Sequence, residues 1–270
     1  MTIRLAAQEH MLEGATLVEK FRFAQACGFD GVELRGAGKG WFGARVEEVR
    51  AARAAGVVMP TVCVMMDHFI GDFDAARRKD AREQMKILLS VIVEAGGFGA
   101  VTPASYGMFS LRLPPFEPPR TAEQDREILL EELTALGEHA RDVGAVVLLE
   151  PLNRYEDHMV NTLAAGAGLV REVGLASVAL IGDFFHMSIE ESDPAQALRD
   201  VAPHLRHLQL GDTNRLEPGA GHYDWARSLD ALEEIGYDGW MAMECRLSGP
   251  PAQVLPRVSA LLRRPAGADA

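Results

Sequence analysis

The sequence contains no apolar stretch that could cross a membrane. Its segments all fall short of the roughly 18 uninterrupted apolar residues that a spanning helix requires. The first residues lack the basic and then apolar pattern that is typical of a secretory signal. We therefore expect a cytoplasmic protein with no membrane partner.

Cysteines and basic side chains are also scarce. The three cysteines, Cys27, Cys63 and Cys245, are odd in number and lack the spacing of a metal-binding motif, so we expect packed thiols rather than disulfides. The 39 Asp and Glu residues outnumber the 27 Lys and Arg residues, which gives a formal net charge of −12 at pH 7. Because phosphate binding needs Lys and Arg gathered on one face, we expect no nucleic-acid partner.

What the sequence does contain is a regular alternation of short apolar runs and longer segments with helical spacing. The runs predict strands at 3–7, 31–35, 57–64, 99–102, 146–150, 178–181, 204–210 and 240–244. Helices are predicted after them at 15–27, 44–55, 75–95, 121–143, 163–173, 194–201, 225–235 and 252–262.

Eight strand-and-helix units of roughly 30 residues each indicate an α/β fold, the (β/α)8 TIM barrel. We expect a single domain over residues 1–264 and a C-terminal tail at 265–270. No Gly-x-Gly-x-x-Gly follows the first strand, which speaks against a dinucleotide-binding fold. A proline-rich segment at 113–119 is long enough to form a lid or a subunit contact.

Polar residues end the last four predicted strands. These are Glu150, Asp183, Gln209 and Glu244, each about one strand-and-helix unit after the one before. Because strand side chains alternate, each lies on the same face as the apolar residue two positions earlier, so all four can converge over the barrel mouth. Active sites of this fold lie at that end of the barrel.

Three carboxylates and one amide oxygen form a donor set that suits a hard divalent ion such as Mn²⁺ or Mg²⁺. Without a cation the carboxylates would repel one another and their pKa values would rise. The other interpretation is that some of them are solvated or paired with Arg154, Arg215 or Arg246.

Several segments resemble the sugar phosphate isomerase/epimerase superfamily of xylose isomerase-like TIM barrels. Within it, the sequence is most similar to the ketose 3-epimerases of the tagatose/psicose type and to hydroxypyruvate isomerase. The segments that carry the resemblance are 149–156, 183–187, 211–215, 218–221 and 236–239.

The resemblance implies that Glu150, Asp183, Gln209 and Glu244 bind one Mn²⁺, Co²⁺ or Mg²⁺ ion, and that Glu150 and Glu244 form the catalytic acid–base pair. One position departs from the ketose 3-epimerases, which carry His where this chain has Gln209. Hydroxypyruvate isomerase resembles this chain in using Gln, and an amide oxygen is also a suitable ligand.

The resemblance further implies that Glu156, His186 and Arg215 contact oxygens of a small carbohydrate substrate. A structural role for His186, or a surface ion pair for Arg215, remains an alternative. The family relationship and the proline-rich segment indicate a homo-oligomer, either a dimer or a tetramer.

The predicted reaction is isomerisation or epimerisation of a small keto-sugar or sugar derivative. A proton is removed from the carbon next to a carbonyl held by the metal, and the paired Glu150 and Glu244 return it. The alternative is a keto-sugar lyase of the inosose dehydratase type, which starts with the same proton abstraction. A nuclease of the endonuclease IV type would need further His and Asp ligands and a basic surface. An inactive sugar-binding protein would be expected to lose one of the two glutamates.

Two polar residues lie below or beside the predicted site. His207 precedes Gln209 by two positions and is expected to be a hydrogen-bonded core residue. Glu33, near the end of the second strand, either binds substrate or pairs with Arg35.

Overall fold

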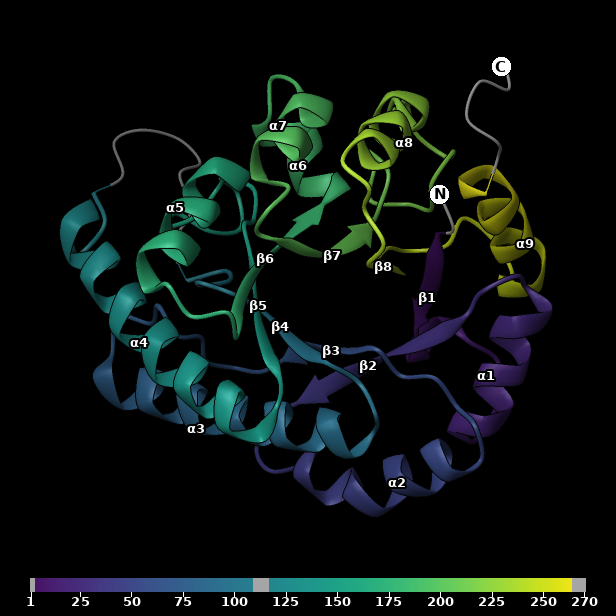
Figure 1. The fold of residues 1–270 in the computed structure, drawn as a ribbon, viewed down its shortest axis with the longest axis horizontal. Helices are drawn as coiled ribbons and strands as arrows, with labels where there is room; N and C mark the ends of the chain where they lie inside the picture. Colours follow the sequence, from purple (N-terminus) through teal and green to yellow (C-terminus); the bar gives the residue numbers. More distant parts are fainter. Residues whose placement is uncertain (1–2, 109–116, 264–270) are drawn as a thin grey trace.

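Eight parallel strands close into a barrel, and helices surround it on the outside (Figure 1). This computed structural model describes residues 3–108 and 117–263. The strands are β1 Arg4–Gln8, β2 Gly31–Ala37, β3 Thr61–Met65, β4 Gly99–Pro103, β5 Val146–Glu150, β6 Val178–Asp183, β7 Leu205–Leu210 and β8 Trp240–Met243.

The helices are α1 Leu17–Ala26, α2 Val46–Ala54, α3 Ala75–Glu94, α4 Ala122–Val143, α5 Leu163–Val173, α6 Phe184–Glu190, α7 Pro194–Val201, α8 Trp225–Glu234 and α9 Pro251–Leu262. Two short 3-10 helices cover Glu9–Met11 and Gly43–Arg45. The strands follow one another in chain order around the barrel, and β8 pairs with β1. The predicted TIM barrel is therefore confirmed.

Apart from shifts of one or two residues at element ends and the two 3-10 helices, the structure differs from the sequence prediction at two places. The third strand begins at Thr61 rather than at Val57, because the preceding Pro60 has no backbone N–H to donate to a ladder. Helix α6 was not predicted; Asp183 caps it by accepting from the backbone N–H of His186 at 3.0 Å. This cap places a candidate ligand at the junction of β6 and α6.

The strand side chains divide into two apolar layers. One set packs between the strands and the helices and forms the larger core. The other set fills the barrel interior in small separate clusters, to which Leu148, Ile181 and Ala242 belong. Glu150, Asp183 and Glu244 each lie two positions after one of these interior residues, so they continue the inward-facing series.

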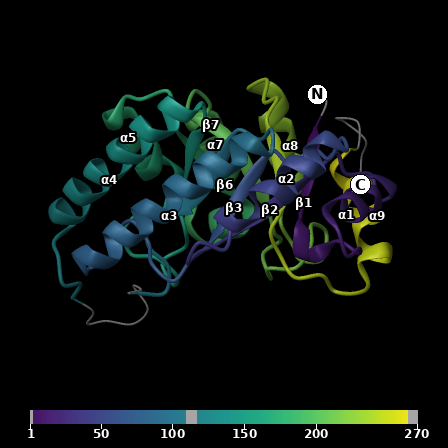
Figure 2. The ribbon, with the colours of Figure 1, turned by 90° about the horizontal axis from the view of Figure 1, so that it is seen from below.

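The two ends of the described chain lie close together. Figure 2 shows α1 and α9 at the same side of the barrel. The Ser259 hydroxyl on α9 donates to the Cys27 carbonyl that ends α1, at 2.7 Å. The predicted tail at 265–270 and most of the proline-rich segment, residues 113–116, lie outside the described residues.

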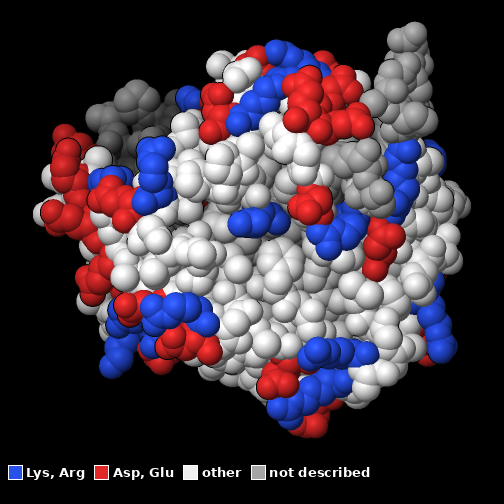
Figure 3. Space-filling model, in the orientation of Figure 1, with Lys and Arg blue, Asp and Glu red and all other residues white. Residues whose placement is uncertain are grey.

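Charged side chains on the surface alternate in sign. On the face shown in Figure 3, Lys and Arg lie among Asp and Glu around the rim, and a few charged side chains of both signs lie nearer the middle. Among the described helices, none is long and apolar enough to cross a membrane.

Candidate active site

Three buried oxygen atoms at the ends of β5, β6 and β7 have no hydrogen-bond partner within residues 3–108 and 117–263. They are Glu150 Oε1, Asp183 Oδ2 and Gln209 Oε1. Their side chains are almost entirely enclosed, with exposed fractions of 3%, 1% and 0%. A buried polar atom without a partner costs about 1–3 kcal/mol, so three such acceptors on neighbouring strands are suited to a cation or to hydrogen-bond donors.

The pKa values of the two carboxyl groups in this cluster are displaced upward. Burial raises the pKa of Glu150 well above its usual range, and the nearby charges of Glu244 and Asp183 raise it further. Burial also raises the pKa of Asp183 to about 7; Arg215 opposes the shift and Glu244 adds to it. A divalent cation would relieve the desolvation and the repulsion together.

The amide of Gln209 is held by a carboxylate that the sequence did not connect with it. Gln209 Nε2 donates to Glu33 Oε2 at 3.2 Å, on the far side from its unpaired Oε1. Glu33 also accepts from Gln8 Nε2 at 3.0 Å, Thr61 Oγ1 at 2.8 Å and His207 Nε2 at 2.9 Å. Glu33 is completely buried, which raises its pKa, but these hydrogen bonds prevail and lower the pKa overall.

Neither expectation for Glu33 describes its contacts. Glu33 makes no ion pair with Arg35, whose Nη2 instead lies 2.9 Å from Met65 Sδ. Nor does Glu33 line either cavity at the barrel mouth. The prediction that His207 is a hydrogen-bonded core residue agrees with its 0% exposure and its contact with Glu33.

Glu244 lies just beyond the end of β8 and is more accessible than the other three predicted ligands. Its Oε1 accepts from Gln8 Nε2 and from the thiol of Cys63, each at 3.3 Å. Its Oε2 lies 3.7 Å from Arg215 Nη2. The side chain is 22% exposed and lines both cavities at the mouth, so it can reach a substrate.

The hydrogen bonds of His186 fix which ring nitrogen carries the proton. Its Nδ1 lies 3.0 Å from the backbone N–H of Asn153, which can only donate, so Nδ1 accepts. Burial, with the charge of Arg215, holds the pKa of His186 well below its usual value, so the ring is neutral and its proton is on Nε2.

The protonated Nε2 of His186 points into the site. Nε2 lies 3.7 Å from Glu150 Oε1 and 2.9 Å from Arg215 Nη1, which is also a donor. One atom each of Glu150, Asp183 and His186 lie within 4.8 Å of one another, the spacing of a metal site. A protonated Nε2 cannot ligate, however, so the unpaired amide oxygen of Gln209 is the better third ligand. His186 and Arg215 instead present two donors to an acceptor.

A cavity of about 310 Å³ opens above these residues, and its lining includes Glu150, Glu156, His186, Arg215 and Glu244. A second hollow of about 420 Å³ shares part of this wall, including Glu156 and Arg215. Together they form the open mouth of the barrel. Five of the seven predicted site residues therefore line this mouth. The other two, Asp183 and Gln209, are buried and pair with each other in the register of β6 and β7.

Arg215 is held in an unusual backbone conformation. Its φ of 58° lies in the left-handed region, and its guanidinium stacks 4.5 Å from the centre of the Phe185 ring. The loop that carries it is fastened by Asp212, which accepts from the backbone N–H groups of Gly219 and Tyr223 and from Trp225 Nε1. Such strain is found at functional positions when the surrounding structure imposes it.

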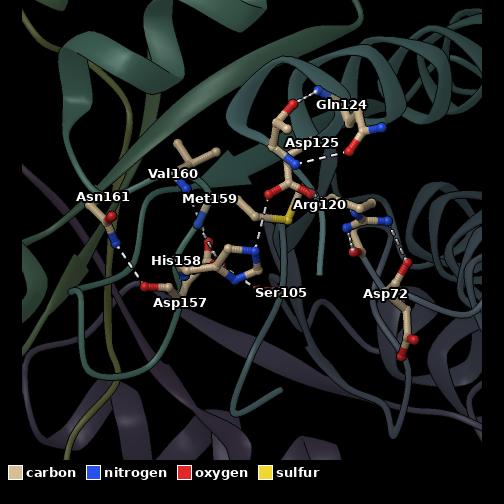
Figure 4. A network of polar contacts seen from close by, with 12 residues as sticks. Asp72, Ser105, Arg120, Gln124, Asp125, Asp157, His158, Met159, Val160 and Asn161 are labelled. Carbon is tan, nitrogen blue, oxygen red and sulfur yellow. Dashed lines mark hydrogen bonds and ion pairs between the residues drawn. The ribbon is translucent and has the colours of Figure 1, made fainter. Parts of the chain in front are cut away.

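A polar network around Asp157 and His158 holds the loop between β5 and α5 (Figure 4). Asp157 accepts from the Ser105 hydroxyl and from the backbone N–H groups at the start of its own turn. His158 Nε2 lies 3.1 Å from Asp125 Oδ2, and Arg120 Nε donates to Asp125 Oδ1 at 2.6 Å. The network ties this loop, which also carries Glu156, to the start of α4.

Three comparisons place the chain among known proteins. A family model described as xylose isomerase-like TIM barrel matches residues 21–264. The chain is 39% identical over 253 residues to the 3-dehydro-D-guloside 4-epimerase of Escherichia coli K12, a match that covers 93% of this chain and 95% of that protein. It is 40% identical over 120 residues to the D-psicose 3-epimerase of Enterocloster bolteae, covering 44% of this chain and 40% of that protein.

Among solved structures, the apo form of 3-keto-D-glucoside 4-epimerase from E. coli superposes with a TM-score of 0.90 at 38% identity. That match covers 97% of this chain and 99% of the other. The resemblance read from segments such as 149–156 is confirmed by these matches.

Proposed function

This chain belongs to the xylose isomerase-like TIM barrel family, and from that premise we propose that it is a divalent-metal-dependent epimerase of a keto-sugar. The observation that carries the proposal is a set of three unpaired buried oxygens among the described residues, on Glu150, Asp183 and Gln209. Oxygens of Glu150 and Asp183 lie within 4.8 Å of one another, and Gln209 pairs with Asp183 in the sheet. The relative that matches 93% of the chain is a 4-epimerase of a 3-dehydro sugar glycoside, which indicates a sugar with a carbonyl beside the inverted carbon.

Glu150, Asp183, Gln209 and Glu244 would hold the ion. Their donor set is composed of oxygen alone, which suits Mn²⁺, Co²⁺ or Mg²⁺. When bound, such an ion supplies Lewis-acid stabilisation of the negative charge that develops on the substrate carbonyl oxygen. The unpaired oxygens and raised pKa values of the carboxyl groups support the fit.

The two glutamates, Glu150 and Glu244, carry the proton. One carboxylate takes the proton from the carbon beside the carbonyl, and the C–H electron pair moves toward the carbonyl oxygen. The other, in its protonated form, returns a proton to the opposite face of the same carbon, and the configuration inverts. Glu150 comes from β5 and Glu244 follows β8, so they approach the cavity from different parts of the barrel. Positioned proton transfer contributes about 10²–10⁴ in rate.

Substrate orientation falls to His186, Arg215 and Glu156. His186 Nε2 and Arg215 Nη1 lie 2.9 Å apart, and both are donors, so one sugar oxygen on the cavity side of the pair would accept from both. Glu156 lines both hollows and accepts from sugar hydroxyls. We also propose a homo-oligomeric, cytoplasmic enzyme with no nucleic-acid partner, as the sequence predicts.

The test is incubation of the metal-free protein, reloaded with Mn²⁺, with 3-keto-glycosides, ketoses and hydroxypyruvate in D₂O. NMR follows deuterium at carbon. We expect the C4 epimer of a 3-keto-glycoside with deuterium at C4, and no turnover in EDTA. Loss of water in place of epimerisation would establish the lyase. Turnover that persists without any divalent ion would overturn the proposal.

A further inference from the structure

We propose that Glu33 is a positioning residue that turns the amide of Gln209 so that its carbonyl oxygen faces the metal ligands. This inference rests on the proposed metal site. Glu33 is on β2, has 0% exposure, and does not line the cavities at the mouth. It therefore acts through other side chains and does not touch the substrate.

The argument starts from what a carboxylate can do. An ionised Glu33 only accepts hydrogen bonds, and four side-chain donors converge on its two oxygens. Its Oε2 receives Gln209 Nε2 at 3.2 Å, so Gln209 Oε1 must point the opposite way, where it has no partner in the described structure. In the register of the sheet Gln209 pairs with Asp183, another candidate ligand.

The Gln209 side chain needs this hydrogen bond to fix its orientation, because rotation about its last side-chain bond exchanges the positions of the amide oxygen and nitrogen. If Gln209 turned over, its carbonyl oxygen would face Glu33 Oε2, and two acceptors would meet. Its NH₂ group would then face the cation and could not ligate. The carboxylate of Glu33 excludes that orientation.

Glu33 orients a second amide by the same means. Gln8 Nε2 donates to Glu33 Oε2 at 3.0 Å and also lies 3.3 Å from Glu244 Oε1. Because Glu33 fixes the nitrogen of Gln8 on this side, Glu244 receives a donor rather than a repelling oxygen. One buried carboxylate thus orients a candidate ligand, Gln209, and steadies another, Glu244.

The other two donors hold Glu33 itself. Thr61 Oγ1 and His207 Nε2 both donate to Oε1, at 2.8 and 2.9 Å. They leave Oε2 to the two amides. Thr61→Val therefore offers a matched control, since it removes one buried hydrogen bond to Glu33 and keeps the carboxylate.

The test is a Mn²⁺ titration of the metal-free full chain, read by electron paramagnetic resonance without substrate. We expect Glu33→Gln to raise the Mn²⁺ dissociation constant about 10–100-fold. An amide at position 33 can donate as well as accept, so it no longer selects one orientation of the Gln209 amide. Thr61→Val should change it far less. If Glu33→Gln does not fold by circular dichroism, Glu33→Asp replaces it; its shorter side chain withdraws from Gln209 and should weaken Mn²⁺ binding in the same direction.

A double-mutant cycle distinguishes a purely structural role of Glu33 from a role exerted through Gln209. If Glu33 acts through Gln209, the effect of Glu33→Gln on Mn²⁺ affinity shrinks when Gln209 is already Ala. Full additivity, or an unchanged dissociation constant in a folded Glu33 variant, overturns the inference and leaves the metal site standing. Failure of the wild-type chain to bind Mn²⁺ overturns the proposed function, and this inference with it.

Discussion

Glu33 and Glu150 are two glutamates on inward-facing positions of the same barrel, and both are almost completely buried. Glu33 meets four donors, and its pKa is lowered. Glu150 has an unpaired oxygen and carboxylate neighbours, and its pKa is raised. Burial alone therefore does not assign a role to a buried charge. The partners distinguish the two: Glu33 is satisfied by four donors, whereas Glu150 keeps one oxygen unpaired among the described residues.

The same contrast separates two buried aspartates. Asp212 accepts from backbone N–H groups and from Trp225, and these hydrogen bonds lower its pKa against the effect of burial. Asp183 accepts from the backbone N–H of His186 on one oxygen, has no partner in the described residues for the other, and its pKa is raised to about 7 by burial. The loop aspartate maintains the fold, whereas the strand-end aspartate keeps an oxygen available.

The contrast between Glu33 and Glu150 should be largest in turnover. We expect Glu150→Gln, and likewise Glu244→Gln, to lower kcat by about 10²–10⁴, because an amide cannot carry the proton. Mn²⁺ binding should be weakened but measurable, since the amide oxygen can still ligate. At saturating Mn²⁺, Glu33→Gln should lower kcat far less. Steady-state kinetics measure both variants, and an equal loss of kcat in Glu33→Gln and Glu150→Gln would contradict the different roles assigned to the two glutamates.

In the metal-free protein the same substitutions should affect stability in different ways. Glu33→Gln replaces an acceptor of four hydrogen bonds and should lower the free energy of unfolding by about 1–3 kcal/mol. Glu150→Gln removes repulsion from Asp183 and Glu244 and should be neutral or stabilising. Urea unfolding in EDTA measures both. A larger loss for Glu150→Gln than for Glu33→Gln would contradict the comparison.

The pH dependence of Mn²⁺ binding should reflect the raised pKa of Asp183. Its folded pKa of about 7 lies above the ordinary 3.8, so its contribution to metal-free stability is fully present below about pH 4 and lost as pH rises through 7. Mn²⁺ binds the carboxylate, so its affinity should fall as pH drops below 7, and binding should release protons. Calorimetry in buffers of different ionisation enthalpy counts those protons; no release at pH 6 would count against the site.

An exposed glutamate should show the smallest effect. Glu172 pairs with Arg126 on the surface, and both side chains are 47% exposed. Water screens such a pair, so Glu172→Gln should leave the urea midpoint unchanged within experimental error. A shift as large as that of Glu33→Gln would show that the loss of a charge, rather than of buried partners, decides the outcome.

The fold was predictable from the sequence because apolar residues recur with one spacing in strands and with another in helices. Residues 163–173 and 194–201, for example, are helical with the predicted bounds. The seven-residue helix α6 was missed because it begins at a strand end and depends on a cap from Asp183. A segment this short carries too few turns to show a helical period.

The site was only partly predictable. Alternation placed Glu150, Asp183 and Glu244 on inward-facing series, and the structure brings their ends to one mouth. The link between Glu33 and Gln209 runs across the barrel from β2 to β7, and no spacing along the chain encodes it. The sequence offered one indication of this link, a glutamate, Glu33, near the end of the second predicted strand.

The most direct test of the central claim is the fate of the proton at C4 of a 3-keto-glycoside in D₂O, with Mn²⁺ present or removed. We expect deuterium at C4 in the epimerised product, neither exchange nor epimerisation in EDTA, and epimerisation slowed by about 10²–10⁴ with Glu244→Gln. An epimer formed without deuterium from solvent, or one formed equally well by Glu244→Gln, would contradict proton transfer between Glu150 and Glu244.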